Sequence, residues 1–152
     1  MTRFDTAIWT LVFSQLESDP VPPASPADMV VFEKMHGVAL PHAHQEFLAR
    51  VNGGEFRYAR FFGIGRTDYL DHEEFINGIR SYIQDMSDGE VLPIAVDWGG
   101  SYFCYDIRRQ AKDGDFPVLL WDHEYSEDLA DRPMLWKEYA PDFVSFVRKV
   151  LV

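Results

Sequence analysis

The sequence predicts an α+β domain with a largely antiparallel sheet of about four or more strands flanked by helices. Helical residue spacing occurs near both ends, whereas three β-rich runs follow one another in the second half. Strands and helices do not alternate regularly, which disfavours a doubly wound parallel sheet. The chain has 152 residues, of which 47% are apolar and 15% aromatic, so it has enough material for one packed core.

The first segment, residues 1–18, predicts an amphipathic helix. Its apolar residues recur at helical spacing: Phe4, Ala7, Ile8, Leu11, Val12 and Leu16. Residues 19–26, DPVPPASP, contain four prolines and predict a linker, because proline can neither continue a helix nor enter a sheet interior. We therefore expect the helix to pack as an arm on a single domain spanning residues 26–152.

The domain should open with a helix. Ser25 suits the N-cap, Pro26 suits the first helical position, and Asp28 favours the positive end of the helix dipole. This helix should run to about His36 and stop at Gly37, because glycine tolerates the left-handed conformation that ends helices.

A second helix should begin after Leu40-Pro41 and end at Asn52-Gly53-Gly54. Its buried side carries Phe47, Leu48 and Val51. Asparagine and glycine tolerate positive φ, as a C-terminal cap requires, so this triplet predicts the end of the helix.

His42 and His44 lie in this second helix. Positions two apart on a helix point about 200° away from each other, so the pair cannot bind one metal ion. The His pair at i and i+4 with an intervening Glu, typical of zinc proteases, is absent. We expect both histidines to be partly exposed and to bind no metal.

The second half of the chain predicts the sheet. After a short strand at residues 59–65 and a helix over residues 71–86, three β-rich runs follow at residues 91–98, 101–107 and 116–122. Gly99-Gly100 and the polar stretch RRQAKDGD separate the three runs, which favours an antiparallel meander. A loop at residues 123–133 and a helix at residues 140–152 complete the expected order. The final helix should bury Phe143, Val144, Val147 and Leu151.

Cys104 is the single cysteine, so an intrachain disulfide is impossible. It lies in the apolar run SYFCYDI and should be a small buried side chain. The sequence has no apolar run of the ~20 residues that span a membrane, and its start does not resemble a signal peptide. These features indicate a cytoplasmic protein.

The formal net charge of −11 bears on the class of partner. Nucleic acids and anionic membranes bind clustered Lys and Arg, so direct binding to either is disfavoured. A basic protein partner is favoured by the same electrostatic argument.

Three aspartates are candidates for catalysis, because each lies near the end of a predicted strand: Asp97, Asp106 and Asp122. If they converged at one edge of the sheet, they could support acid–base hydrolysis. Aspartate at a strand end also starts turns by accepting hydrogen bonds from nearby backbone N–H groups, and this role is favoured here. No serine lies in a G-x-S-x-G setting, and no P-loop is present, so we expect no catalytic residues.

Asp122, His123 and Glu124 form a triplet of metal-binding residue types. Adjacent strand residues alternate faces, and no partner ligands stand at a recognisable spacing. We therefore expect no metal and no cofactor.

Four stretches, taken in order, resemble the SUKH superfamily: LPHAHQEFLARVNGGEF, VLPIAVDWGGSYFCYD, VLLWDHE and APDFVSFVRKVL. The superfamily includes fungal cell-wall assembly regulators and many bacterial immunity proteins. The resemblance covers about residues 26–152. It implies structural roles for Leu40, Pro41, Asn52, Gly53, Gly54, Pro93, Gly99 and Gly100.

The resemblance also implies a function. Bacterial members of the superfamily resemble cytoplasmic antitoxins that bind and block a cognate toxin, often a nuclease with a basic cleft. An acidic protein suits such a cleft, so we expect a basic toxin domain as partner. The expected contact surface combines acidic and aromatic residues: Asp97, Trp98, Asp122, His123, Glu124, Tyr125, Glu127 and Asp128.

The sequence leaves two alternatives open. One is a scaffold or regulatory module without a toxin partner, and the other is a hydrolase that uses the strand-end aspartates. The sequence does not indicate the oligomeric state.

Overall fold

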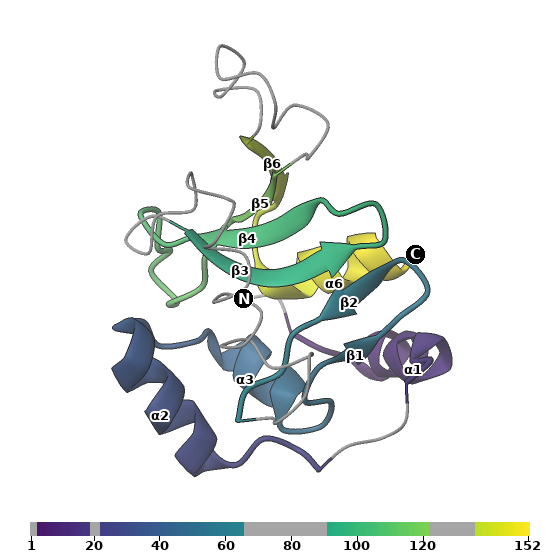
Figure 1. Cartoon of the computed structure of the whole chain (residues 1–152), viewed down its shortest axis with the longest axis horizontal. Coiled ribbons are helices and arrows are strands. Elements are labelled where there is room, and N and C mark those ends of the chain that lie inside the picture. The colour runs from purple at the N-terminus through teal and green to yellow at the C-terminus, as the bar shows by residue number, and fades with distance from the viewer. Residues whose placement is uncertain (1–2, 19–21, 66–90, 122–135) are drawn as a thin grey trace.

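The computed structural model describes residues 3–18, 22–65, 91–121 and 136–152 of the chain (Figure 1). The helices are α1 (Thr6–Gln15), α2 (Pro26–His36), α3 (His42–Leu48) and α6 (Phe143–Leu151). The strands are β1 (Gly54–Glu55), β2 (Ala59–Phe61), β3 (Val91–Asp97), β4 (Tyr102–Asp106), β5 (Val118–Trp121) and β6 (Trp136–Ala140). The helix predicted over residues 71–86 and the loop predicted over residues 123–133 lie outside the described residues.

The six strands form one antiparallel sheet in the order β1-β2-β3-β4-β5-β6, so each strand pairs with its neighbour in the described sequence. The α+β class and the antiparallel meander are therefore confirmed. The sequence did not predict β6, which occupies the segment just before the last helix. It also did not predict β1, which has two residues.

Both faces of the central strands are buried. Successive residues alternate between two apolar clusters, so that Phe103 and Tyr105 belong to the larger cluster while Tyr102 and Cys104 belong to the smaller one. Burial on both faces explains why β3, β4 and β5 read as nearly continuous apolar runs. Cys104 is fully buried, as the sequence predicted.

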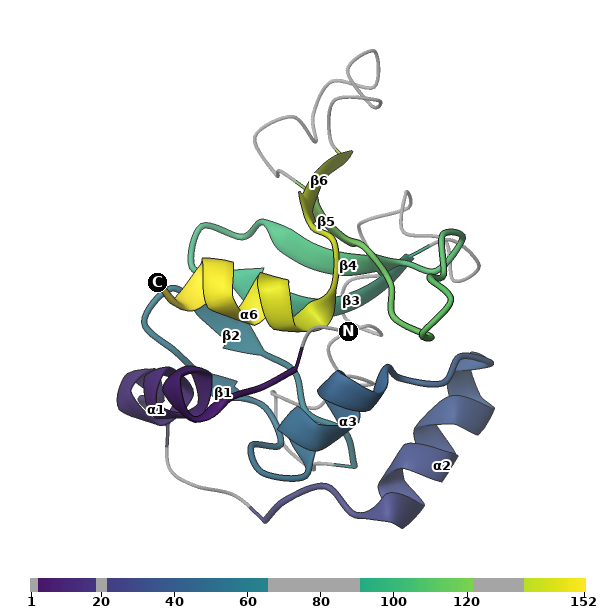
Figure 2. The same ribbon diagram turned by 180° about the vertical axis from the view of Figure 1, so that it is seen from behind.

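Helices α1, α3 and α6 contribute to the larger cluster, the main core. Figure 2 shows α6 lying across one face of the sheet, with α1 beside β1. α6 begins at the N-cap Asp142, whose carboxylate accepts a hydrogen bond from Ser145 N at 2.8 Å. The four residues predicted to be buried in α6 are buried.

α1 is built into this core. Ile8, Trp9 and Val12 are buried within it, and Gln15 Nε2 donates a hydrogen bond to the carbonyl oxygen of Leu151 in α6. The N-cap of α1 is Asp5, which accepts a hydrogen bond from Ile8 N at 2.8 Å. The N-terminal helix therefore shares its buried surface with the last helix of the chain.

The predicted ends of α2 are confirmed. Ser25 and Asp28 form a reciprocal capping box, with distances of 2.8 Å from Ser25 N to Asp28 Oδ2 and 3.1 Å from Asp28 N to Ser25 Oγ. Gly37 ends the helix with φ of 68°, and its N–H donates to the carbonyl of Glu33.

The predicted end of α3 is wrong. The helix ends at Leu48 with Ala49 in the right-handed region, several residues before Asn52. The Asn52 side chain instead binds the backbone of Ile64 twice, and Gly53 takes a φ of 79°. Asn52-Gly53-Gly54 therefore joins the segment after α3 to the segment after β2. It makes long-range contacts and does not cap the helix.

His44 also differs from the prediction, because its side chain is only 6% exposed. Its Nδ1 lies 2.8 Å from the Tyr105 hydroxyl in a hydrogen bond, and its ring stacks on Phe143 with centroids 4.1 Å apart. Burial lowers the pKa of His44 to about 3, so the ring is neutral at ordinary pH. His42, by contrast, is exposed, as predicted.

Candidate partner-binding surfaces

Two of the three candidate catalytic aspartates, Asp97 and Asp106, lie at opposite ends of the β3–β4 pair. Val91 at the start of β3 pairs with Asp106 at the end of β4, whereas Asp97 lies at the other end. The separation is about five residues along a strand, or roughly 17 Å. Asp97 and Asp106 therefore cannot act on one substrate atom together, and Asp122 lies outside the described residues.

Each of these two carboxylates holds a local turn. Asp97 Oδ1 accepts hydrogen bonds from the N–H groups of Gly99 and Ser101, both at 2.9 Å. Asp106 is buried and pairs with Arg108, whose Nε lies 2.9 Å from Asp106 Oδ1. Both aspartates thus take the turn role that the sequence favoured.

Trp98 projects from the β3–β4 turn and is 51% exposed. Its indole Nε1 donates a hydrogen bond to the carbonyl oxygen of Phe56 at 3.1 Å. Since Phe56 lies in the β1–β2 connection, this bond ties two neighbouring turns together. Gly100, with φ of 93°, completes the β3–β4 turn. The ring of Trp98 is therefore exposed and yet held in position.

Each of the two exposed aromatic rings in these turns has an arginine beside it. The guanidinium carbon of Arg60 lies 5.2 Å from the Trp98 ring centroid, and that of Arg57 lies 5.3 Å from the Tyr58 ring centroid. Tyr58 is 45% exposed. We refer to Arg57, Tyr58, Arg60 and Trp98 as the Trp98 corner. The sequence alone does not single out Arg57, Tyr58 or Arg60. The β2–β3 register, in which Arg60 pairs with Val96, brings Arg60 to the end of the sheet where Trp98 lies. The hydrogen bond from Trp98 to Phe56 ties the β1–β2 connection, which holds Arg57 and Tyr58, to the same end.

The predicted contact residues Asp122, His123, Glu124, Tyr125, Glu127 and Asp128 lie outside the described residues. The flanking strands nevertheless fix where the chain leaves the sheet. Trp121, the last residue of β5, pairs with Tyr102 and with Trp136, the first residue of β6. Because Tyr102 pairs with Val96, β5 ends at the same end of the sheet as the β3–β4 turn.

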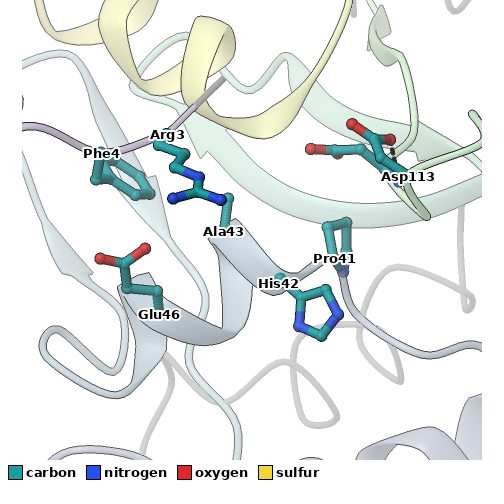
Figure 3. A pocket seen from close by; sticks show the side chains of 8 residues that line it. Arg3, Phe4, Pro41, His42, Ala43, Glu46 and Asp113 are labelled. Atoms are coloured by element: carbon teal, nitrogen blue, oxygen red, sulfur yellow. Dashed lines mark hydrogen bonds between the residues drawn. The ribbon is translucent and has the colours of Figure 1, made fainter. Parts of the chain in front are cut away.

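A cleft of about 500 Å³ lies at the other end of the sheet (Figure 3). Its lining residues come from the N-terminal segment, α3 and the β4–β5 connection: Arg3, Phe4, Pro41, His42, Ala43, Glu46, Asp113 and Asp115. Figure 3 shows Asp113 across the cleft from Arg3 and Glu46, so the lining carries both signs of charge. This mixture does not indicate one class of ligand.

Asp115 is the most buried charged residue of this lining. Its Oδ1 accepts a hydrogen bond from Phe116 N at 2.8 Å. Burial first, and then the nearby Asp142 carboxylate, raise the pKa of Asp115 to about 6, although backbone hydrogen bonds act in the opposite direction. Beneath the cleft, burial first and then the charges of Asp115 and Asp142 raise the pKa of Tyr105, so its hydroxyl stays protonated.

Within the segments that the structure describes, no group of three or more His, Cys, Asp or Glu side chains is arranged to hold a metal ion. In the same segments, no helix is long and apolar enough to cross a lipid bilayer.

Comparison with models of known families gives one match. Residues 23–149 match the model of the SMI1/KNR4 family (SUKH-1). The chain belongs to the SUKH-1 family. Comparison with curated protein sequences gives no significant match. Membership confirms the resemblance drawn from the sequence motifs, and it places the chain among immunity-type and regulator-type protein-interaction domains that are generally not enzymes.

Several residues given structural roles by the SUKH resemblance lie in the core or at the ends and irregularities of helices and strands. Leu40 is buried, and Pro41 precedes α3 as its N-cap residue. Pro93 lies in β3 beside an irregularity in the register between Pro93 and Ala95, where a proline is tolerated within a sheet. α1 lies outside the matched range, yet it packs into the same core as the SUKH-1 segments.

Proposed function

We propose that this SUKH-1 protein acts by binding, as an immunity protein that neutralises a cognate toxin through direct contact. The observation that carries the proposal is the family match over residues 23–149. The formal charge of −11 agrees with a basic toxin, such as a nuclease whose cleft is shaped for nucleic acid. No substrate is transformed in this account, and no cofactor is required.

The proposed contact surface is the end of the sheet where the β3–β4 turn lies. Trp98 is a suitable anchor, because an exposed aromatic ring held in place loses little conformational freedom on binding. Asp97 supports this surface by holding the turn. The acidic residues Asp122, Glu124, Glu127 and Asp128, with His123 and Tyr125, are proposed to extend it, since the chain leaves β5 at this end.

Electrostatic steering gives the proposal a kinetic consequence. An excess of negative charge attracts a basic partner over distances comparable to the Debye length, about 8 Å at physiological salt. The association rate should therefore fall as salt rises, while the dissociation rate should change less.

The test is coexpression of the chain with the toxin encoded beside its gene, followed by surface-based binding kinetics at low and high salt. We expect protection of the host cells and an association rate that falls with salt. Absence of both protection and binding at low salt would remove the proposal. Stable binding to a non-toxic host protein, with little salt dependence, would indicate the regulatory module instead.

A further inference from the structure

We infer that the Trp98 corner binds a carboxylate-bearing segment of a protein partner. The inference deepens the proposed function, on which it rests, by naming the local chemistry of one contact. It differs from the expectation that acidic and aromatic residues, without arginines, form the contact surface around Trp98.

The charge of the corner is opposite to that of the whole chain. The sequence has 25 acidic and 14 basic residues, yet Arg57 and Arg60 flank the two exposed aromatic rings of the corner. Among the described residues, neither arginine forms an ion pair with a carboxylate, whereas Arg108 and Arg109 do. In an acidic protein, two guanidinium groups that form no ion pair among the described residues are available for the carboxylates of a partner, although the register places Glu55 of β1 opposite Arg60.

Arg60 also carries an unsatisfied donor. Its Nε is buried and has no hydrogen-bond acceptor among the described residues. A buried donor without an acceptor destabilises the free protein. A partner's oxygen atom removes that cost if the Arg60 side chain turns outward on binding and presents this donor. A carboxylate is the acceptor that best matches a guanidinium edge, since it can take two parallel N–H bonds.

The aromatic rings define the rest of the contact. The Nε1 of Trp98 is already bonded to the carbonyl of Phe56, so the ring offers its apolar surface rather than its N–H group. Arg60 lies by that ring, and Arg57 by Tyr58, which keeps the cations close to apolar surface. The complementary segment therefore combines Asp or Glu with apolar side chains.

A protein segment fits this corner better than a nucleic acid. Nucleic-acid binding draws its affinity from several Lys and Arg contacts spread along the phosphate backbone. The corner supplies two arginines within a chain of formal charge −11, which repels a polyanion at longer range.

The test is a nuclear magnetic resonance titration of the full ¹⁵N-labelled chain with three probes. The first is a short blocked peptide in which Glu alternates with Phe and Leu. The second is the same peptide with Lys in place of Glu, and the third is a single-stranded oligodeoxynucleotide. The indole N–H of Trp98 and the Nε–H of Arg60 report on the corner, and the fitted dissociation constant measures affinity.

We expect the Glu peptide to shift both signals and the Lys peptide to leave them in place. Arg60→Gln should weaken binding of the Glu peptide by about tenfold, as expected for loss of a charge-assisted contact. Arg109→Gln is the matched control, because it removes the same charge from an exposed arginine after β4, at the other end of the sheet. It should leave the dissociation constant unchanged. Thermal unfolding of each variant separates loss of binding from loss of folding.

Three results would overturn the inference: no shift with the Glu peptide, equal binding of the Glu and Lys peptides, or equal losses in the two arginine variants. Tighter binding of the oligonucleotide at the same residues would assign the corner to phosphate and also overturn it. The proposed function fails separately. If the chain binds the Glu peptide but no toxin, only the proposed toxin partner is contradicted. If Arg60→Gln binds the toxin as tightly as the parent does, only the role of the Trp98 corner in toxin binding is contradicted.

Discussion

The side chain of Asn52 makes two hydrogen bonds with the backbone of Ile64, from Asn52 Nδ2 to the carbonyl oxygen at 2.8 Å and from Ile64 N to Asn52 Oδ1 at 2.9 Å. Both bonds are buried, and they join the end of α3 to the segment after β2. The side chain thus satisfies one donor and one acceptor that water cannot reach. These two bonds help to fix the position of β1 and β2 relative to α3.

Asn52→Ala should lower the free energy of unfolding by about 2–4 kcal/mol, because two buried backbone groups lose their partners. Chemical denaturation monitored by tryptophan fluorescence measures the change. Gln110→Ala is the control, since Gln110 makes an exposed bond to the carbonyl of Gly114. If Asn52→Ala lowered the free energy of unfolding no more than the control does, the structural role of the two Asn52–Ile64 hydrogen bonds would be contradicted.

Gly53 and Gly37 offer a matched comparison. Both have positive φ, 79° and 68°, but a Cβ at Gly53 would lie 2.5 Å from Gly63 N, whereas one at Gly37 would meet nothing within 4 Å. Gly37→Ala should cost about 1 kcal/mol for its backbone conformation alone. Gly53→Ala should cost at least about 2 kcal/mol more, because backbone must move as well. Equal unfolding midpoints for the two variants would contradict the close approach.

His44 predicts a dependence of stability on pH. Its pKa falls from 6.5 to about 3 on folding, because burial disfavours the charged ring. Below pH 6.5 the unfolded chain therefore binds a proton that the folded chain does not. The full stability is therefore present above that pH and is lost progressively as pH falls toward 3, by as much as about 5 kcal/mol.

Asp115 makes stability depend on pH in the opposite direction, since its pKa rises from 3.8 to about 6 on folding. Its contribution is fully present below pH 3.8 and is lost as pH rises through 6. The two effects offset each other in the parent protein, so variants are needed to separate them. Between pH 7 and pH 4, stability should fall less in His44→Gln than in the parent, and fall more in Asp115→Asn. If denaturation at each pH gave parallel curves for all three proteins, the burial of both groups would be contradicted.

Local sequence signals predicted the elements whose ends are fixed by nearby residues. The α2 helix shows this most clearly, because the Ser25–Asp28 capping box and Gly37 act within a few residues of one another. The meander was predicted for a similar reason, since β3, β4 and β5 are apolar runs separated by glycine-containing or polar connections.

Features set by long-range contacts could not be predicted in this way. His44 becomes a core residue only because Tyr105 and Phe143 reach it from distant segments. The edge strand β6, WKEYA, has exposed Lys137 and Glu138 and carries a weak apolar signal. The candidate site likewise combines local and long-range features. The position of Trp98 beside a turn indicated its exposure from the sequence, whereas Arg60 reaches it only through the pairing of β2 with β3.

The central claim is that the protein acts by binding a toxin and not by chemistry of its own. The most direct measurement is the activity of the purified toxin encoded beside the gene, titrated with the full chain. The account predicts that activity falls in proportion to added chain and reaches zero at a fixed stoichiometry, with the toxin recovered chemically intact when the complex is dissociated. Toxin activity unchanged by excess chain, or a toxin that emerges covalently altered, would contradict it.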